Sequence, residues 1–394
     1  MPVGKKKKKK VIKEMLITEN KMISRFAARK KLMPYLVSAV AAASLLFGGD
    51  SQAASREEVA AIQVATAADF RYWNEDSPAL GKLKRFVREA TTPGHPKFIP
   101  EADRVAVFDM DGTFYCETAP YYFQEVMFLH RALDDASYKP DKKMADFAKK
   151  IRPKIMERIG LSPEETKTLI AYLTKAYQGM TPEEYRAYVR DFMQTSETGL
   201  TNLRRGEAFY LPMVEVMSYL TNNGFAVYID SACGAATTRE LVGGVIPVPL
   251  DRILATDFVY TSTGMGKEAP NDHFYDRRKE KIVISGAPLI DNAKTRKIFS
   301  ILNQIGKKPV LAFGNSMGDS GMFEYTLQDN PYQSAAFCVL CDDLERELGN
   351  TAKADAMKKT ADERGWNTIS MKGDFKTIYG ENVKRAERQE TEKK

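Results

Sequence analysis

The stretch VAVFDMDGT, residues 105–113, constrains the fold of this chain more than any other. Its first four residues are apolar, and such a run is typical of a short strand that is covered on both faces of a sheet. Asp109 and Asp111 follow the run directly and precede a Gly-Thr turn. In open α/β sheets, ligands bind at the carboxyl ends of the strands. The two aspartates therefore indicate a functional site at the end of a buried parallel strand.

Helical patterns fill the region that follows this strand. Residues 121–198 contain no strand signal, and two of their helices begin with a capping box that has proline at the first helical position, at Ser162 and at Thr181. Upstream, residues 81–91 have helical periodicity and end at a Thr-Pro-Gly stop. Downstream, the patterns predict strands at 225–229, 309–313 and 335–340, and helices at 212–223 and 295–305.

This order predicts an α/β fold: a doubly wound parallel sheet with an all-helical cap inserted after its first strand. The predicted parts are a signal peptide at 1–54, a core at 55–114 and 206–381, a helical cap at 115–205 and a polar tail at 382–394 that frays. An insert at this point of the chain lies over the carboxyl end of the sheet. We therefore expect it to cover Asp109 and Asp111 like a lid.

Positive charge is concentrated at the N-terminus. The chain of 394 residues has a net charge of +7, but residues 1–54 hold twelve Lys or Arg against three acidic residues, a net +9, which leaves −2 for the remainder. A slightly acidic remainder without a basic aromatic stripe argues against nucleic-acid binding.

Residues 1–54 also have the order of segments found in export signals. A basic segment is followed by an apolar stretch at 32–47 and by small residues. We predict cleavage after Ala53 or Ala54, with an uncleaved anchor as the alternative. Cleavage would leave an exported protein, periplasmic or secreted, with no stable membrane anchor.

Four cysteines follow the predicted signal peptide: Cys116, Cys233, Cys338 and Cys341. An even number in an exported chain permits disulfides without demanding them. Cys116 and Cys233 lie close in sequence to the first two motifs described below, so we expect both near the same site. They form either a disulfide with each other or two reduced thiols, and both alternatives remain open. Cys338 and Cys341 have the spacing of metal ligands, but no second such pair exists. A local disulfide or two buried thiols is the simpler interpretation of that pair.

Four short motifs occur in chain order, each at the end of a predicted strand or the start of a predicted helix. They are Asp109-Met110-Asp111-Gly112-Thr113, Ser231 after the strand FAVYID, Lys294 at the start of the helix KTRKIFSIL, and Gly314-Asn315-Ser316-Met317-Gly318-Asp319 after the strand PVLAF. In this order and spacing they resemble the haloacid dehalogenase (HAD) superfamily of phosphatases. Within it they resemble the phosphoserine-phosphatase-like branch, in which a helical cap lies between the first and second motifs.

The resemblance to exported bacterial members of that branch extends to three longer stretches. These are YWNEDSPALGKLKRFV, GMTPEEYRAYVRDF and LAFGNSMGD, and together with the motifs they cover roughly residues 70–345. The resemblance implies a Rossmann-like core and a Mg²⁺-dependent phosphatase.

The chemistry of the first motif follows from its residue types. A carboxylate at the strand end, Asp109, can attack a phosphoryl group and form an aspartyl-phosphate that water then hydrolyses. Asp111 can protonate the leaving oxygen and later take a proton from water. Two carboxylates this close call for a cation, and Mg²⁺ prefers carboxylate, carbonyl and phosphate oxygens.

The resemblance implies the other roles. Ser231 and Lys294 would bind the phosphoryl group, with backbone N–H groups at Gly112 and Thr113. The metal ligands would be Asp109, the Asp111 carbonyl, Asn315 and Asp319.

Two positions depart from the usual family pattern. Asn315 stands where many relatives have Asp, which removes one negative charge from the expected metal site. Asp230 and Cys233 flank Ser231, where apolar and glycine residues are common. These departures bear on substrate class more than on reaction type.

Three residues at the start of the cap are candidates for contact with the leaving group of the substrate: Glu117, Tyr121 and Tyr122. In relatives this region touches the leaving group, so Glu117 would meet a cationic head such as an amine or choline. The alternative is a helix-capping acid beside aromatic residues that are buried in the cap.

The sequence thus predicts an exported, Mg²⁺-dependent hydrolase of small organic phosphomonoesters. Two alternatives remain open. One is a phosphotransferase that uses the same aspartyl-phosphate, and the other is a non-catalytic module that binds a phosphate ligand.

Overall fold

The computed structural model describes residues 53–117 and 121–386, and every structural statement below concerns this part of the chain. Residues 1–52, which carry nearly all of the predicted signal peptide, lie outside it, as do residues 118–120 and 387–394. The described residues belong to one unit. None of its helices combines the length and the apolar character that crossing a membrane would require.

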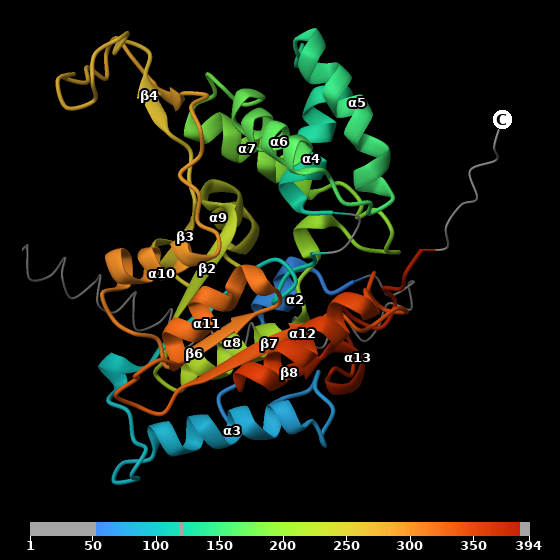
Figure 1. Ribbon diagram of the computed structural model, residues 1–394, viewed down its shortest axis with the longest axis vertical. Coiled ribbons are helices and arrows are strands. Elements are labelled where there is room, and N and C mark those ends of the chain that lie inside the picture. The colour runs from blue at the N-terminus through green and yellow to red at the C-terminus, as the bar shows by residue number, and fades with distance from the viewer. Residues whose placement is uncertain (1–52, 118–120, 387–394) are drawn as a thin grey trace, which may run out of the picture. The chain divides into compact units, whose positions relative to one another are not determined.

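A parallel sheet of six strands forms the centre of this unit (Figure 1). The strands run in the order β3-β2-β1-β6-β7-β8, and all neighbours are parallel. They are β1 (Val105–Phe108), β2 (Ala226–Gly234), β3 (Ile253–Thr256), β6 (Leu311–Gly314), β7 (Ala335–Leu340) and β8 (Asn367–Ser370). The predicted α/β fold with a parallel, doubly wound sheet is confirmed.

Strand β1 is buried along its whole length, as its apolar sequence predicts. Val105 and Val107 face one hydrophobic core, and Ala106 and Phe108 face the other. Alternate side chains therefore pack on opposite faces of the sheet, which is the situation of a strand covered on both sides.

A ladder of three aromatic rings crosses the middle of the sheet. Phe108, Phe313 and Phe337 occupy paired positions on β1, β6 and β7. Their rings are stacked, with centroids 4.2 Å and 5.1 Å apart. Because each ring lies beside its neighbour only in this register, the ladder helps to hold the ends of β1 and β6 level with each other.

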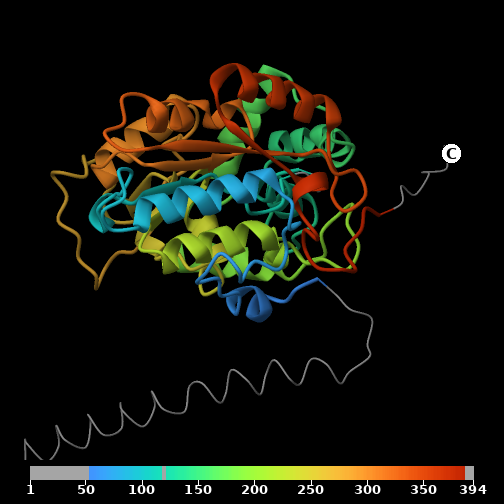
Figure 2. The same ribbon diagram turned by 90° about the horizontal axis from the view of Figure 1, so that it is seen from below.

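Helices cover both faces of the sheet (Figure 2). One core includes buried residues of α3 and α8, and the other includes residues of α11 and α12. The helices outside the cap are α2 (Arg56–Ala60), α3 (Pro78–Thr91), α8 (Leu211–Asn222), α9 (Ala235–Val242), α10 (Thr295–Ser300), α11 (Ser320–Leu327), α12 (Thr351–Arg364) and α13 (Met371–Asp374).

Four helices lie between β1 and α8 in the chain, within the predicted cap. They are α4 (Phe123–Leu133), α5 (Lys142–Met156), α6 (Pro163–Lys175) and α7 (Pro182–Met193). Both predicted capping boxes are present, at Ser162 with Glu165 and at Thr181 with Glu184. Each satisfies two N–H groups that the first helical turn would otherwise leave unpaired.

Side chains join these helices to the carboxyl end of β2 and to the helix that follows it. Gln124 on α4 accepts a hydrogen bond from the backbone N–H of Gly234 at 2.8 Å. The hydroxyl of Tyr185 on α7 lies 2.8 Å from that of Thr237 on α9. The helical insert therefore contacts the core at the end of the sheet where the predicted site residues lie.

A second insertion, which the sequence patterns do not predict, separates β3 from α10. It contains an antiparallel pair of strands, β4 (Tyr260–Ser262) and β5 (Ile282–Ile284), and extends beside α7 (Figure 1). Ile284 exchanges backbone hydrogen bonds with residues 179 and 180, at 2.9 Å each. The short strands and irregular connection carry little periodicity, which explains why the insertion is not visible in the sequence.

Other predicted boundaries shift by a few residues. Strand β2 continues to Gly234, beyond the predicted end at 229. The helix predicted at 295–305 is α10 followed by a π-helical turn, Ile301–Ile305. The first residues of the predicted polar tail contact the rest of the unit: Val383 is buried, and Ala386 donates a backbone hydrogen bond to Gly199 at 2.8 Å.

Candidate active site

The direction of the strand order reverses between β1 and β6. From β1 the chain moves to β2 and β3 on one side, and later to β6, β7 and β8 on the other. The carboxyl end of such a reversal point is the usual ligand crevice of an open α/β sheet. Asp109 follows β1 at this point, and its backbone N–H donates to the carbonyl of Phe313 on β6 at 2.8 Å.

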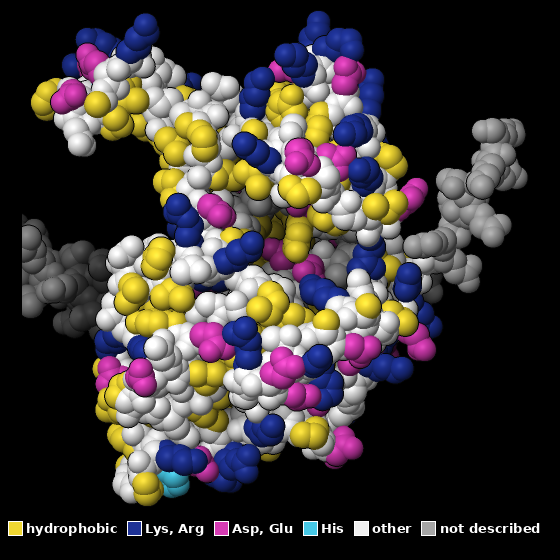
Figure 3. All heavy atoms as spheres, in the orientation of Figure 1, with side chains coloured by type: hydrophobic (Ala, Val, Ile, Leu, Met, Phe, Trp, Pro, Cys, Tyr) yellow, Lys and Arg dark blue, Asp and Glu magenta, His cyan; other side chains and the backbone are white. Residues whose placement is uncertain are grey.

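A surface hollow lies near the carboxyl ends of these strands (Figure 3). It separates the surface over α4–α7 from the surface over the sheet, and acidic side chains are visible inside it. Asp109 is 7% exposed, so its carboxylate is mostly shielded from bulk water.

The turn after Asp109 depends on Gly112. This residue has φ +78, and a Cβ atom there would lie 1.8 Å from Asn315 Nδ2. Only glycine satisfies both the conformation and the close approach. The turn uses its own N–H groups: Gly112 donates to Tyr115 O at 2.7 Å, and Thr113 donates to Met110 O at 3.1 Å. Both N–H groups, which were expected to face a phosphate, are instead hydrogen-bonded within the turn.

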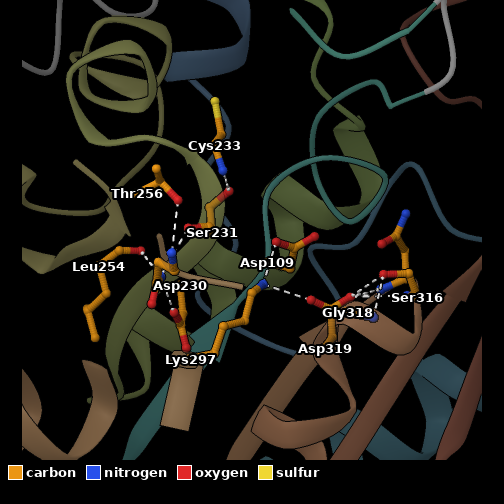
Figure 4. A network of polar contacts seen from close by, with 12 residues as sticks. Asp109, Asp230, Ser231, Cys233, Leu254, Thr256, Lys297, Ser316, Gly318 and Asp319 are labelled. Atoms are coloured by element: carbon orange, nitrogen blue, oxygen red, sulfur yellow. Dashed lines mark hydrogen bonds and ion pairs between the residues drawn. The ribbon is translucent and has the colours of Figure 1, made fainter. Parts of the chain in front are cut away.

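The lysine of the site is Lys297, not Lys294. Its Nζ lies 2.7 Å from Asp109 Oδ1 and 2.7 Å from Asp319 Oδ1 (Figure 4). Lys297 is the one buried residue of α10, at 2% exposed. Lys294 is exposed and precedes the helix with φ 56. The sequence interpretation aligned the motif one helical turn too early, because either lysine fits the start of this helix.

Ser231 is fully buried near the end of β2. Its Oγ accepts a hydrogen bond from the backbone N–H of Cys233 at 3.1 Å (Figure 4). The pairing of β2 with β3 shifts register between Ser231 and Gly234, which marks an irregularity in the strand at this residue.

Asn292 holds the end of β2 in place, a role that the motif pattern does not reveal. Its Nδ2 donates to Asp230 Oδ1 at 2.8 Å, and to the carbonyls of Ser231 at 3.0 Å and Leu254 at 3.2 Å. Its Oδ1 accepts from the hydroxyl of Ser300 on α10 at 2.6 Å. One amide thus links β2, β3 and α10, the helix that carries Lys297.

Asp319 has both carboxylate oxygens engaged. Oδ1 accepts from Lys297, while Oδ2 accepts from the backbone N–H groups of Asn315 at 3.0 Å and Ser316 at 3.1 Å. It therefore orients the loop after β6 and the ammonium of Lys297. These contacts suit a positioning residue better than the direct metal ligand that the sequence analysis expected.

The site holds more acidic groups than cations. Asp109, Asp111, Asp230 and Asp319 surround Lys297, the one buried lysine among the described residues. Burial, with the charge of Asp319, raises the pKa of Asp109 to about 7. Burial also raises the pKa of Asp230 to about 7 and that of Asp111 well above its ordinary value. Burial lowers the pKa of Lys297, but the neighbouring aspartates outweigh it and raise that pKa overall.

The donor groups fit a divalent cation in charge, although no three Asp, Glu, His or Cys side chains of the described residues converge on one point. Asp111 Oδ1 and Asn315 Nδ2 are buried and have no hydrogen-bond partner among the described residues. A flip of the Asn315 amide would place its oxygen beside Gly112 without breaking a hydrogen bond of its side chain. Asp109, the Asp111 carbonyl and Asn315 could then supply oxygen ligands.

Glu117 lies beside the same turn. A Cβ atom on Gly112 would be 2.9 Å from Glu117 Oε2. The carboxylate oxygens of Glu117 accept from Lys353 Nζ, on α12, at 2.8 Å and 2.7 Å. Tyr122 donates its hydroxyl to Glu117 Oε1 at 3.2 Å, and the ring of Tyr121 packs edge-on against Tyr122. The carboxylate that was expected to meet a cationic leaving group is therefore already paired with a lysine.

The hypothetical disulfide between Cys116 and Cys233 is not formed, because Cys233 is a buried thiol. Cys338 and Cys341 are also buried thiols, so the local disulfide considered for that pair is absent. Burial raises the pKa of Cys233 well above its ordinary value, which keeps it protonated and unreactive.

No protein-family model and no curated protein matches the chain. Solved structures resemble it at low identity. One is a functionally unknown protein from Anaerococcus prevotii, with 12% identity, a TM-score of 0.46, and coverage of 81% of this chain and 97% of that one. Another is the cytosolic 5'-nucleotidase IIIB bound to cytidine, with 12% identity, a TM-score of 0.43, and coverage of 74% and 86%.

A third is a phosphoserine phosphohydrolase-like protein from Francisella tularensis. It is 13% identical, with a TM-score of 0.34 and coverage of 64% of this chain and 99% of that one. Phosphatases are thus among the solved structures that this chain resembles.

Proposed function

We propose that this protein is a phosphomonoester hydrolase of the HAD superfamily that acts through an aspartyl-phosphate on Asp109. The observation that carries the proposal is the triad of Asp109, Lys297 and Asp319 at the point where the strand order reverses, with Asp111 two residues after Asp109. This arrangement brings the buried carboxylate of Asp109, the buried cation of Lys297 and the carboxyl group of Asp111 together in one crevice.

Asp109 would be the nucleophile. The ammonium of Lys297, 2.7 Å away, favours the anionic form of this buried carboxylate and orients Oδ1. The same cation would stabilise the negative charge of a phosphoryl group that approaches Asp109, which is the electrostatic contribution expected to dominate phosphoryl transfer. Asp319 and Asp230 keep Lys297 protonated.

Asp111 would be the general acid and base. Burial and the neighbouring charges of Asp109 and Glu117 raise its pKa well above the ordinary value of a carboxyl, which favours its protonated form. A protonated carboxyl can donate to the leaving oxygen, and the resulting carboxylate can take a proton from the water that hydrolyses the intermediate.

Ser231 would donate its hydroxyl to the phosphoryl oxygens, since its Oγ accepts from Cys233 and keeps its proton free for a ligand. When bound, Mg²⁺ would supply charge neutralisation for the phosphoryl group. Asp109, the Asp111 carbonyl and Asn315 would hold it.

We further propose that the protein is exported and that residues 1–54 are its signal peptide. Support comes from the basic, apolar and small-residue segments of the sequence. N-terminal sequencing of the protein from the producing cell should find Ala54 or Ser55 first. An intact N-terminus would contradict this part of the proposal.

The test of the activity is hydrolysis of p-nitrophenyl phosphate by the full chain, with Mg²⁺ and with EDTA. We expect metal-dependent turnover that Asp109→Asn abolishes. Asp251→Asn is the matched control, because Asp251 is exposed and outside the crevice. Turnover that survives in Asp109→Asn, or no turnover with any divalent metal, would overturn the proposal.

A further inference from the structure

The ion pair between Glu117 and Lys353 is the feature of the crevice that the proposed chemistry does not use. The two residues are 236 positions apart in the chain, and Lys353 Nζ lies 2.7 Å and 2.8 Å from the two carboxylate oxygens of Glu117. Glu117 precedes the cap helix α4, whereas Lys353 is in the first turn of α12 in the core. The pair therefore joins the core to the entrance of the cap.

The pair is largely shielded from water. The side chain of Glu117 is 8% exposed and that of Lys353 is 30% exposed. Burial lowers the pKa of Lys353, but the charge of Glu117 outweighs it and raises that pKa overall, so the lysine is a full cation. A carboxylate at this depth needs a cation beside it, because an unpaired charge in a shielded site is strongly unfavourable.

The pair also lies at the reaction centre. Glu117 Oε2 and Asn315 Nδ2 both approach Gly112, three residues after the proposed nucleophile. The charge of Glu117 contributes to the raised pKa of Asp111, the proposed proton donor to the leaving group. The part of a substrate beyond its phosphate would therefore lie near the ion pair of Glu117 and Lys353.

We infer that Lys353 is a specificity residue that excludes cationic leaving groups from the site. This inference rests on the proposed function. A substrate ammonium could reach Glu117 only by displacing an ammonium that already has two short contacts, and it would then face the displaced cation. A neutral leaving group has no such conflict. The site therefore selects phosphomonoesters with uncharged leaving groups by disfavouring cationic competitors, without a new attractive contact to the neutral group.

Two probes of matched shape isolate this charge effect. Phosphocholine and 3,3-dimethylbutyl phosphate differ in a quaternary nitrogen that replaces a quaternary carbon. For the unmodified chain we expect kcat/KM for the neutral probe to exceed that for phosphocholine by about tenfold or more, the size of effect typical of one charge contact in a shielded site.

Lys353→Met should reverse the preference, because it removes the cation and leaves Glu117 available to the choline group. The double variant Glu117→Gln, Lys353→Met should bring the ratio of the two probes close to one. Lys358→Met, an exposed lysine on the same helix, is the control and should leave the ratio unchanged.

The affinities of both probes for the unmodified chain and the three variants, measured by calorimetry, repeat the comparison without turnover. A loss of catalysis is thereby distinguished from a loss of charge selectivity. An absence of p-nitrophenyl phosphate hydrolysis would reject the proposed function. A probe ratio, in turnover or in binding, that is the same in Lys353→Met as in the unmodified chain would overturn the inference. So would a preference of the unmodified chain for phosphocholine.

Discussion

Lys297 Nζ lies 2.7 Å from Asp109 Oδ1, although the two residues are 188 positions apart in the chain. This contact joins the end of β1 to the first turn of α10. It gives a buried carboxylate its counter-ion, and it identifies which of two nearby lysines serves the site.

Replacement of Lys297 should greatly reduce kcat, whereas replacement of Lys294 should not. Lys297→Met should reduce kcat for p-nitrophenyl phosphate by about a thousandfold or more, because it removes the charge that stabilises the transferring phosphoryl group. Lys294→Met, three residues earlier and exposed, should keep kcat within about twofold of the unmodified chain, as surface substitutions usually do. Equal losses in the two variants would contradict the assignment.

Gly112→Ala should damage both stability and activity. The residue has φ +78, and the added Cβ would collide with Asn315 Nδ2 at 1.8 Å. We expect unfolding free energy to fall by about 2 kcal/mol or more, measured by urea denaturation. Gly94→Ala is informative as a control: it has a similar φ of +81 but open space around it, so it reports the backbone strain alone. Equal losses in both variants would show that the contact with Asn315 is unimportant.

Asn315→Asp should strengthen metal binding. The substitution adds one negative charge to a group of ligands already rich in oxygen. The Mg²⁺ concentration for half-maximal activity should fall about tenfold. Without metal, the same variant should have a lower melting temperature than the unmodified chain, because it adds a buried carboxyl to a site with four. Unchanged metal dependence would argue against Asn315 as a ligand.

Glu215 on α8 provides a test of pH dependence away from the crevice. It is 1% exposed and accepts from the backbone N–H groups of Arg71 at 2.7 Å and Tyr72 at 3.1 Å. Burial outweighs these bonds and raises its pKa from 4.5 to about 7.

The pKa of this carboxyl is higher in the folded state than in the unfolded state. Between these two pKa values the folded state therefore binds more protons, and the unfolding free energy falls as pH rises. The unfolding free energy of the unmodified chain should therefore decline relative to that of Glu215→Gln as pH rises from 4.5 to about 7, by about 3 kcal/mol at most. Parallel pH profiles of the two proteins, measured by urea denaturation, would contradict the raised pKa.

The sequence by itself determined the parts of this protein whose signals are local. The apolar run of β1 is a pattern of consecutive residues, and so is the pair of aspartates that follows it. The capping boxes at Ser162 and Thr181 likewise need only neighbouring residues, because a helix start is satisfied within one turn. These features sufficed to predict the parallel α/β fold, the helical region after β1 and the position of Asp109 in the crevice.

Only the tertiary structure decided which distant residues complete the site. Lys297 rather than Lys294 reaches Asp109, because the packing of α10 on the sheet buries one side of the helix and leaves the other in solvent. Asn292 and Lys353 have no motif of their own, and each binds a residue far away in the chain: Asp230 on β2 and Glu117 in the connection before α4. Side-chain charge and burial at such positions depend on contacts between residues far apart in the chain, and local periodicity carries no information about those contacts.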